Sequence, residues 1–509
     1  MSNATLEAIA ANPEAEVTQR HENDTMLAVV YGAALLVSLS IWFLALRAPL
    51  WTDETLSYWQ IAGGFKQIWS RSIQGNSFAA YAYILWLTKT LFGDKELVLR
   101  IPSILAMLAA VYVFYRCARE LFAWDVSLIA TLLFVLPRGI AFAAIDVRPY
   151  PFALLVTNLT ILLFLRWLKT KRMAYAAFLG MAAAGIFYFH YLFASIVVAL
   201  ALYYLLSRHA SVVADLRQIG VAVGCFAIII LPVLPRLKYI YQTRVTHSFA
   251  DPPQWLSVAE MLYPGKWQLL VLAGALVLAA LAHRLLAPSR ETYSKLLLCA
   301  SLVMVPILCL YTISVATSVH IFIPRYLLVA VPGIALCWGS ICSLIDSRQL
   351  RGLFSIAFVA LCAFQAYTSP LAHMHEESWK EALAYADANA AEDQAPLLMC
   401  SPLVEADYLP MPTTASDSVL YAPLSYYKVN APVVPLPRTL NEVAERQAKQ
   451  FLLKAEQEHK RFLVLSPLPS LQIVDLLAYY SQSTYSLRVL GSFDHIWVVE
   501  FVPHVDDAR

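Results

Sequence analysis

Charged residues are scarce in this chain of 509 residues. They make up 14% of it, whereas hydrophobic residues make up 60%. Soluble proteins carry about 25% charged residues, so the composition excludes an ordinary water-soluble globular protein. The formal net charge of +2 is too small to indicate a nucleic-acid partner. Most of the chain is therefore expected to lie in apolar surroundings.

Two sequence signals are also missing. Residues 1–25 are polar and acidic and lack the apolar stretch of a cleavable signal peptide, so the first apolar run is expected to stay as an anchor. Seven of the eight cysteines lie in apolar segments, and their spacing matches no zinc or redox pattern. We interpret them as small apolar packing residues.

Apolar runs of about 20 residues, the length that crosses a bilayer as a helix, are abundant instead. Eleven segments are predicted to span the membrane, namely 26–46, 97–116, 125–145, 150–168, 173–190, 191–207, 217–235, 267–286, 295–316, 323–345 and 351–369. A further apolar piece, residues 78–93, is short and carries Lys89, which favours an interfacial or re-entrant helix.

Basic residues predict the sidedness of these spans, because loops rich in arginine and lysine stay in the cytoplasm. Every second loop is basic; the residues concerned are Arg116, Arg119, Arg166, Lys169, Lys171, Arg172, Arg208, Arg217, Arg284, Arg290, Lys295, Arg348 and Arg351. Eleven spans then place the N-terminus inside and the C-terminal tail outside. If residues 78–93 also spanned, an external N-terminus would be needed, and Asp53 would be separated from the C-terminal tail.

Beyond residue 370 the composition changes to alternating helix and strand patterns. Three stretches, 376–391, 441–460 and 471–483, predict helices, and four short runs, 396–402, 461–467, 486–493 and 495–502, predict strands. This alternation predicts a small α/β domain. The chain is therefore expected to be mainly α, with a polytopic helical bundle and three parts. These are a cytoplasmic tail (1–25), a membrane domain (26–370) with an extracytoplasmic loop (47–96), and an extracytoplasmic α/β domain (371–509).

The stretch WTDETLSYW places two adjacent carboxylates, Asp53 and Glu54, directly after the first predicted span. A charge beside hydrocarbon is costly, so such residues are usually retained for a function. Asp53 could instead cap a helix, since aspartate is a favoured N-cap residue, but capping does not explain the second acid.

Three further polar groups fall on the same predicted face of the membrane. They comprise Asp146 and Arg148 between the third and fourth spans, His190 between the fifth and sixth, and His320, Arg325 and Tyr326 at the mouth of the tenth. Plainer interpretations are an Asp146–Arg148 structural pair, a packing histidine and an arginine that reaches to the interface. Their occurrence on one face favours an active site.

Several motifs in order along the chain carry a resemblance to a known family. WTDETLSYW is followed by LFGDKELVLRIPSILAML with its Arg-Ile-Pro-Ser element (100–103), and then by DVRPYPFALL and IFIPRYLLVAVPGIAL. This set resembles membrane glycosyltransferases of the GT-C superfamily, of the branch with protein O-mannosyltransferases and lipid A aminoarabinose transferases (bacterial glycosyltransferase family 39-like). The chain departs from the pattern at QGNSFAAYAY, where many relatives carry a His-Pro-Pro-like element.

The resemblance implies transfer of a sugar from a polyprenyl-phosphate carrier, at the outer face of a bacterial inner membrane. It implies that Asp53 acts as the general base of an inverting reaction, with Glu54 supporting it or binding the acceptor. Arg325 is the first candidate to bind the donor phosphate, followed by Arg148 and His320, because guanidinium groups suit phosphate.

Asp146, His190 and Tyr326 are candidates for binding the acceptor or a divalent metal ion, whose involvement is left open. The acceptor, implied by the resemblance, is a lipid, a glycan or a protein. Alternative functions are a lipid or polysaccharide transporter or flippase, a polymerase or ligase for undecaprenyl-diphosphate glycans, and a non-catalytic scaffold.

Overall fold

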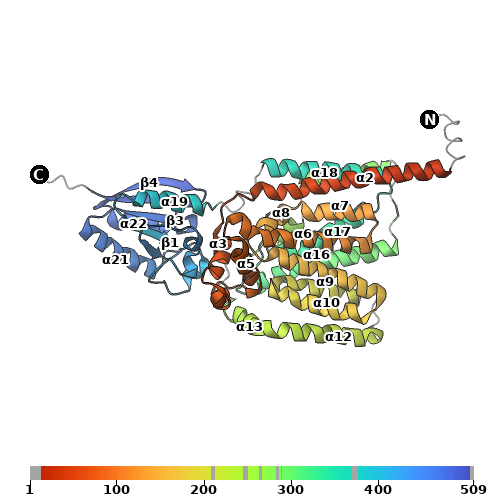
Figure 1. Ribbon diagram of the computed structural model, residues 1–509, viewed down its shortest axis with the longest axis horizontal. Helices are drawn as coiled ribbons and strands as arrows, with labels where there is room; N and C mark the ends of the chain where they lie inside the picture. Colours follow the sequence, from red (N-terminus) through yellow and green to blue (C-terminus); the bar gives the residue numbers. More distant parts are fainter. Residues whose placement is uncertain are drawn as a thin grey trace.

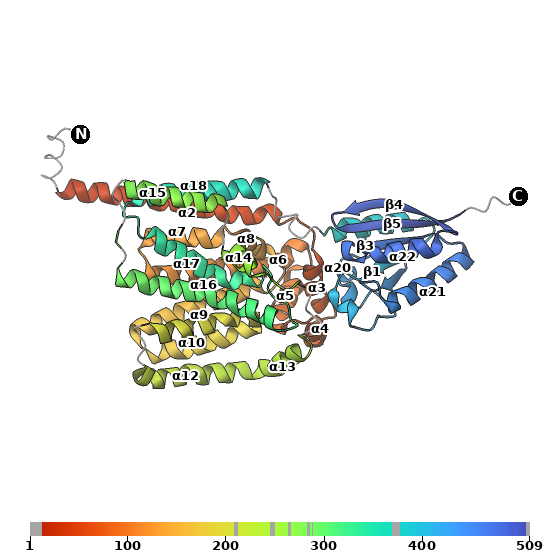
Figure 2. The same ribbon diagram turned by 180° about the vertical axis from the view of Figure 1, so that it is seen from behind.

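A computed structural model describes residues 13–207, 212–244, 250–262, 266–281, 286–287, 289–368 and 377–504. A bundle of long helices forms one end of the elongated molecule, and a smaller part built around a β-sheet forms the other (Figure 1). Short helices lie between these two parts, as the view from behind also shows (Figure 2). The predicted fold class, a mainly helical membrane bundle with a small C-terminal α/β part, is confirmed.

The bundle is built from apolar helices that pack around a common core. They are α2 (Pro13–Trp42), α6 (Glu96–Leu121), α7 (Trp124–Val135), α8 (Arg138–Ile145), α9 (Tyr150–Thr170), α10 (Met173–Gly185), α11 (Ser195–Leu206), α12 (Val212–Ile230), α13 (Leu234–Gln242), α14 (Trp255–Leu262), α15 (Lys266–Leu281), α16 (Arg290–Ala316), α17 (Val331–Cys342) and α18 (Arg348–Thr368). Large side chains such as Trp42, Phe114 and Phe134 are fully buried between them. Outward-facing side chains such as Leu36 and Ile228 are also apolar, as expected of a surface that meets lipid.

Among the described residues, five helices are long and apolar enough to cross a membrane, and the bent pair α7 and α8 would make a sixth. Shorter apolar helices occupy four further predicted spans, and α18 occupies the last. Each predicted segment is thus helical, but the number of eleven spans stays a prediction. Residues 282–285 and 369 of the predicted spans lie outside the described residues, as do the basic residues Arg208 and Arg284.

The third predicted span, 125–145, is not one straight helix. Its two halves, α7 and α8, meet at an angle of 71°. Pro137 stands at the break and precedes the first residue of α8. A proline lacks the backbone N–H that would continue the hydrogen-bond ladder, and it disfavours helical geometry in the residue before it. The bend turns the end of α8, and with it Asp146, toward the short helices.

The short helices α3 (Thr52–Ala62), α4 (Ile68–Gln74) and α5 (Ala79–Phe92) lie at the end of the bundle next to the sheet (Figures 1 and 2). They bury Tyr58, Ile61, Ile68 and Leu85 in a small core that also includes Leu50, Leu99 and Val147. Residues 78–93, for which the sequence favours an interfacial or re-entrant helix, form α5. Its position relative to the lipid surface stays a prediction.

The C-terminal part contains a five-stranded sheet of order β2-β1-β3-β5-β4. The strands are β1 (Leu397–Cys400), β2 (Val433–Leu436), β3 (Phe462–Pro467), β4 (Tyr485–Phe493) and β5 (Ile496–Pro503). β1 pairs in parallel with β2 and β3, whereas β5 pairs antiparallel with β3 and β4. Side chains alternate across β1, so that Leu397 and Met399 face one core and Leu398 and Cys400 the other.

Helices cover both faces of this sheet. Helix α19 (Trp379–Ala390) packs on the Leu397 face, and helices α21 (Glu442–Glu458) and α22 (Leu471–Ser481) pack on the Leu398 face. The three helices and four of the strands are those that the sequence predicts. The edge strand β2 was not predicted. The boundaries of the three predicted parts stay predictions.

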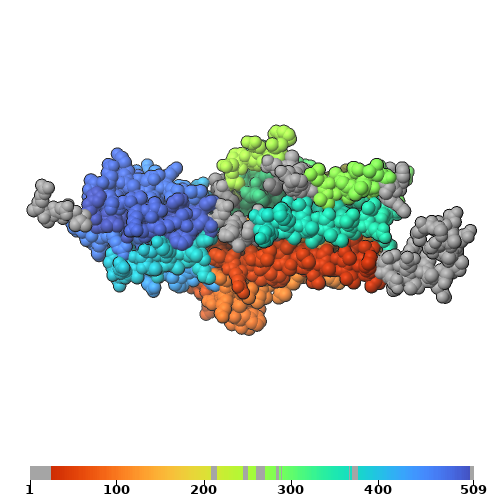
Figure 3. Space-filling model, turned by 90° about the horizontal axis from the view of Figure 1, so that it is seen from above, coloured from red at the N-terminus to blue at the C-terminus, as the bar shows by residue number. Residues whose placement is uncertain are grey.

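On the side of the bundle that Figure 3 shows, α2 and α18 lie side by side along much of their length. Helix α15 continues this layer beside α18. Among the described residues, the helix of the first predicted span therefore packs against the helix of the last predicted span. Both helices lead toward the region where α3 meets the C-terminal part.

Candidate active site between the bundle and the sheet

The first turn of α3 holds the two adjacent acids. Trp51 precedes the helix in an extended conformation, and Asp53 and Glu54 lie in its first turn. Carboxylates are favourable there because the first N–H groups of a helix are unpaired and the helix dipole is positive at this end. The Trp51 N–H donates to the Glu54 carboxylate at 3.3 Å. A capping contact therefore fixes the start of α3, and the residue that makes it is Glu54.

Asp53 pairs with two of the predicted arginines. Its Oδ2 lies 2.6 Å from Nη1 of Arg325 and 3.7 Å from Nη2 of Arg148. Nη1 of Arg148 also donates to the Asp53 carbonyl at 3.2 Å. The Asp53 side chain is 15% exposed. Three residues from distant parts of the sequence thus form one partly accessible ion cluster, at the end of the bundle that faces the sheet.

Glu54 points the other way, into the protein, and its side chain is 2% exposed. Its carboxylate accepts from Nη2 of Arg100 at 3.1 Å and from the Val147 N–H at 2.9 Å. Arg100 also donates to the carbonyls of Leu46 and Ala48. Burial raises the pKa of the Glu54 carboxyl, and the Arg100 guanidinium and the Val147 N–H oppose this rise. The acid pair and the Arg-Ile-Pro-Ser element therefore form one structural unit.

Asp146 is buried next to the ion cluster. The indole Nε1 of Trp51 donates to its Oδ1 at 3.1 Å. Burial, and then the nearby Glu54 carboxylate, raise the pKa of Asp146 well above its usual range. The side chain of Asp146 accepts from Trp51, whereas the side chain of Arg148 turns to Asp53. A protonated Asp146 can donate a hydrogen bond as well as accept one.

Aromatic rings surround His190. Its ring centroid lies 5.3 Å from Tyr150, 5.1 Å from Phe193 and 5.1 Å from Tyr326. The guanidinium of Arg325 lies 5.6 Å from the Tyr326 ring centroid, a cation–π distance. His190 Nδ1 is buried, with no hydrogen-bond partner among the described residues. The structure thus brings both His190 and Tyr326 beside the ion cluster.

His320 is tied to its own segment. Its Nδ1 lies 2.8 Å from the Ser314 carbonyl in the last turn of α16. Since a carbonyl only accepts, this nitrogen carries the proton. Among the described residues, no group of three or more histidine, cysteine, aspartate or glutamate side chains is placed to hold a metal ion.

Sequence reasoning missed several residues that hold the site. Glu377 and Trp379, at the start of the C-terminal part, reach the first turn of α3. The Thr52 N–H donates to Glu377 at 3.0 Å, and the Trp379 indole donates to the Thr52 hydroxyl at 2.8 Å. Burial raises the pKa of Glu377. The sequence carries no periodic signal for such contacts, because the partners are more than 300 positions apart.

The divergent QGNSFAAYAY stretch is held by another missed residue, Arg236 of α13. Its Nε donates to the Ser77 carbonyl and its Nη2 to the Asn76 side chain, each at 3.1 Å. Phe78, which follows, lies 6.2 Å from Tyr191 between ring centroids. This loop therefore packs close to the aromatic surroundings of His190, and Arg236 fixes it there.

Comparison with known proteins finds one partial family match and several similar folds. Residues 79–237 match the model of the dolichyl-phosphate-mannose-protein mannosyltransferase family. No curated protein matches the chain. The structure of ArnT from Cupriavidus metallidurans bound to undecaprenyl phosphate is similar, with a TM-score of 0.52, 13% identity, and coverage of 94% of this chain and 98% of that one. Its apo structure gives the same values.

The archaeal oligosaccharyltransferase AglB from Archaeoglobus fulgidus gives a TM-score of 0.49 and 12% identity, over 96% of this chain and 75% of that one. The partial match to the mannosyltransferase family model and the ArnT-like fold agree with the predicted resemblance to the GT-C superfamily and to its ArnT and protein mannosyltransferase branch.

Proposed function

We propose that this protein is an integral-membrane glycosyltransferase that moves a sugar from a polyprenyl-phosphate carrier to an acceptor. We place its site on the extracytoplasmic side of a bacterial inner membrane. The observation that carries the proposal is the Asp53 carboxylate, paired with Arg325 at 2.6 Å and with Arg148 at 3.7 Å. The mannosyltransferase family match and the undecaprenyl phosphate bound to ArnT support it.

The two arginines are proposed to bind the phosphate of the carrier. Guanidinium groups are permanently charged and offer several donors in a plane, which suits phosphate oxygens. The leaving phosphate gains negative charge during the reaction, so fixed cations beside it lower the barrier. When the phosphate binds, it replaces Asp53 as the partner of Arg325 and Arg148. The Asp53 carboxylate is then available for chemistry.

Asp53 is proposed to act as the general base. Its carboxylate accepts the proton of the acceptor hydroxyl while that oxygen attacks the anomeric carbon. The bond between this carbon and the phosphate oxygen breaks, and the polyprenyl phosphate leaves with the electron pair. Attack from the side opposite the phosphate inverts the anomeric centre in one step, without a covalent enzyme intermediate.

The neighbouring residues have supporting parts in this proposal. Glu54 positions the first turn of α3 through Arg100 and Val147. Asp146, His190 and Tyr326 lie beside the cluster and are assigned to the sugar or the acceptor. His320 is a weaker candidate for the phosphate, because its Nδ1 is engaged by Ser314.

The deciding experiment measures the transfer of a labelled sugar. The purified full-length protein is reconstituted in lipid vesicles, and an envelope extract supplies the acceptor. A radiolabelled polyprenyl-monophosphate sugar should disappear while the acceptor gains one sugar. We expect Asp53→Asn to lower turnover by about 100-fold or more, the usual contribution of a positioned base, with carrier binding retained.

Asp417→Asn is the matched control. Asp417 also pairs with an arginine, Arg71, at 2.7 Å and at the same boundary, but it lies outside the ion cluster. Its turnover should stay near that of the wild type. Near-normal turnover of Asp53→Asn would end the proposal. Use of only diphosphate-linked glycans, or movement of the carrier without sugar transfer, would favour the alternative functions instead.

A further inference from the structure

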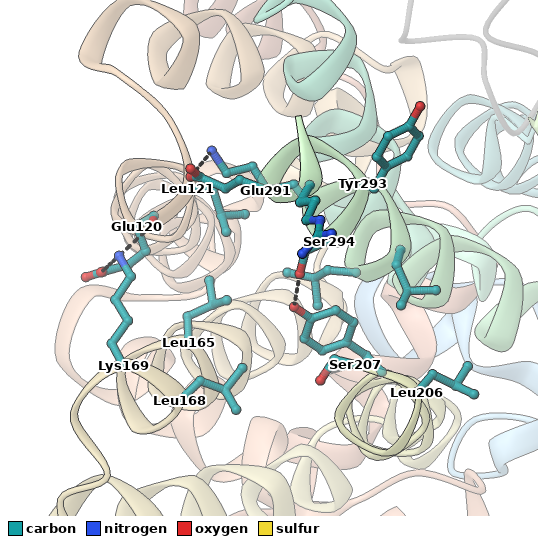
Figure 4. Close-up of a pocket in the computed structure, with 15 residues that line it drawn as sticks. Glu120, Leu121, Leu165, Leu168, Lys169, Leu206, Ser207, Glu291, Tyr293 and Ser294 are labelled. Carbon is teal, nitrogen blue, oxygen red and sulfur yellow. Dashed lines mark hydrogen bonds and ion pairs between the residues drawn. The ribbon is translucent and has the colours of Figure 1, made fainter. Parts of the chain in front are cut away.

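The end of the bundle remote from Asp53 contains a hollow that the proposed function does not use. It has a volume of about 740 Å³ and lies between the last turns of α6, α9 and α11 and the first turns of α16 (Figure 4). α9 connects the two ends, since it begins beside Arg148 and ends at this hollow. We call it the distal pocket.

One side of the distal pocket is charged. Its lining contains three cations, Lys169, Arg290 and Lys295, and two carboxylates, Glu120 and Glu291. Lys169 pairs with Glu120 at 2.9 Å, and Lys295 pairs with Glu291 at 2.8 Å. Arg290 has no ion-pair or hydrogen-bond partner for its side chain among the residues that the structure describes. The lining therefore carries one excess positive charge.

The positive excess is larger when the surroundings are included. Glu120 is shared by Lys169 and by Arg166, whose Nε lies 3.2 Å from its carboxylate. The single carboxylate is thus opposed by two cations before any ligand arrives. A bound anion would neutralise the excess positive charge on this side, and it would not have to displace Glu120 from its partners.

The other side of the distal pocket is apolar. Its lining side chains are Leu121, Leu165, Leu168, Leu206, Leu297 and Leu298. Tyr203 and Ser294 also line the pocket, and their hydroxyl oxygens are 3.0 Å apart. Leu206 and Tyr293 at the rim are exposed large side chains. The pocket therefore combines a cationic mouth with a leucine-rich wall and opens at the surface of the bundle.

We propose that the distal pocket binds an anionic phospholipid of the adjacent leaflet, with its phosphate at Arg290 and Lys169 and an acyl chain along the leucines. Basic pockets between membrane helices bind anionic headgroups, and each lysine or arginine contributes to the attraction. Arginine also offers paired donors to phosphate oxygens. A zwitterionic lipid carries its own cation and gains less from the excess positive charge.

The test titrates full-length protein in detergent with phosphatidylglycerol or with phosphatidylcholine of the same acyl chains. Bound lipid is counted by native mass spectrometry, and stabilisation is followed as the change in Tm. We expect phosphatidylglycerol to be retained preferentially. Arg290→Glu should weaken its binding by about fivefold or more, because it removes one basic contact and adds a repulsive charge.

Two further variants separate charge, space and general effects. Leu168→Trp fills part of the space proposed for the acyl chain without changing the charge, and it should also weaken phosphatidylglycerol binding. Arg172→Glu makes the same charge change on an exposed residue at the start of α10, outside the pocket lining, and should leave binding within about twofold of the wild type, as expected of a screened surface charge.

Equal retention of the two lipids would overturn the proposal, as would wild-type binding by both Arg290→Glu and Leu168→Trp. Equal stabilisation by inorganic phosphate would show an anion site without a lipid chain, and would also overturn it. If Arg290→Glu fails to fold, Leu168→Trp decides. Each readout measures lipid binding, so the outcome is independent of whether sugar transfer is observed.

Discussion

Asp53 and Glu54 are adjacent in the sequence and carry the same functional group, but their surroundings differ. Successive residues of a helix point about 100° apart, so one acid of the pair turns to the ion cluster and the other to the interior. The Glu54 side chain, 2% exposed, has Arg100 and backbone N–H groups as partners. The Asp53 side chain, 15% exposed, has Arg325 and Arg148. The difference in burial thus makes Glu54 a structural residue and leaves Asp53 accessible.

At this scale the first prediction concerns Arg325. Replacing it by alanine removes a charge-assisted contact to the carrier phosphate and should raise the KM for the carrier by about 10- to 100-fold. Arg325→Lys keeps the charge and should lose less. Steady-state kinetics with varied carrier concentration measures both. Unchanged carrier kinetics in the two variants would return Arg325 to a role as an interface anchor.

Helix α3 is fixed by contacts from three directions. Glu54 caps its own helix start, Arg100 holds it against α6, and Glu377 accepts the Thr52 N–H from the side of the sheet. A short helix of 11 residues has little stability of its own in isolation. Its first turn therefore depends on these partners for the placement of Asp53.

The buried Glu54–Arg100 pair yields the prediction at the scale of elements. Glu54→Gln leaves the Arg100 charge buried without a counter-charge and should destabilise the protein by about 3 kcal/mol. Adding Arg100→Met should restore part of this loss, so that the double variant is more stable than the two single effects predict. Unfolding in detergent, followed by circular dichroism, measures the cycle. Strict additivity would show that the two side chains do not interact.

Much of the element pattern could be predicted from sequence, because hydrophobic length and alternation act locally. The helices of the bundle coincide with the long apolar runs of the sequence, and β3 and β5 coincide with short apolar runs. The strand β2 could not be found in this way, because its four residues include Pro435 at a sheet edge. The bend between α7 and α8 was missed, although Pro137 marks it.

The candidate site was predictable only as a set of residues on one face. Topology alone brings Asp53, Arg148 and Arg325 to the same end of the bundle. The contacts of Trp51 with Asp146, and of Glu377 with Thr52, depend on packing between segments far apart in the chain. No local pattern reports such packing. The roles of all these residues in catalysis stay predictions.

The bundle and the C-terminal part meet around α3. The Leu50 N–H donates to the Tyr427 hydroxyl at 2.6 Å, and the Trp59 indole donates to the Asp417 carbonyl at 3.1 Å. Glu377 adds its contact at the first turn. Leu50 before α3, Thr52 in its first turn and Trp59 near its end are thus all hydrogen-bonded to the C-terminal part. Any movement of that part would be transmitted to the first turn of α3.

At the scale of the whole molecule, Glu377 makes this junction sensitive to pH. Its pKa is raised by burial, so the protonated form is the one that the folded junction favours. The stability that it contributes is present below its unfolded pKa and is lost as pH rises through its folded pKa. As the pH increases through the folded-state pKa of Glu377, we expect the Tm of the wild type to fall relative to that of Glu377→Gln.

Thermal unfolding of the two proteins across a pH series measures the difference. The amide of glutamine can still accept from the Thr52 N–H, so the control keeps the hydrogen bond and removes only the titration. A Tm difference that does not change with pH, or that changes in the opposite direction, would contradict the expected protonation of Glu377.

The ion cluster around Asp53 also has a kinetic meaning in the proposed reaction. A carboxylate paired with two guanidinium groups is a weak base, because the neighbouring positive charges favour its ionised form. In that reaction the two salt bridges would therefore couple the basicity of Asp53 to the presence of a phosphate at Arg325 and Arg148.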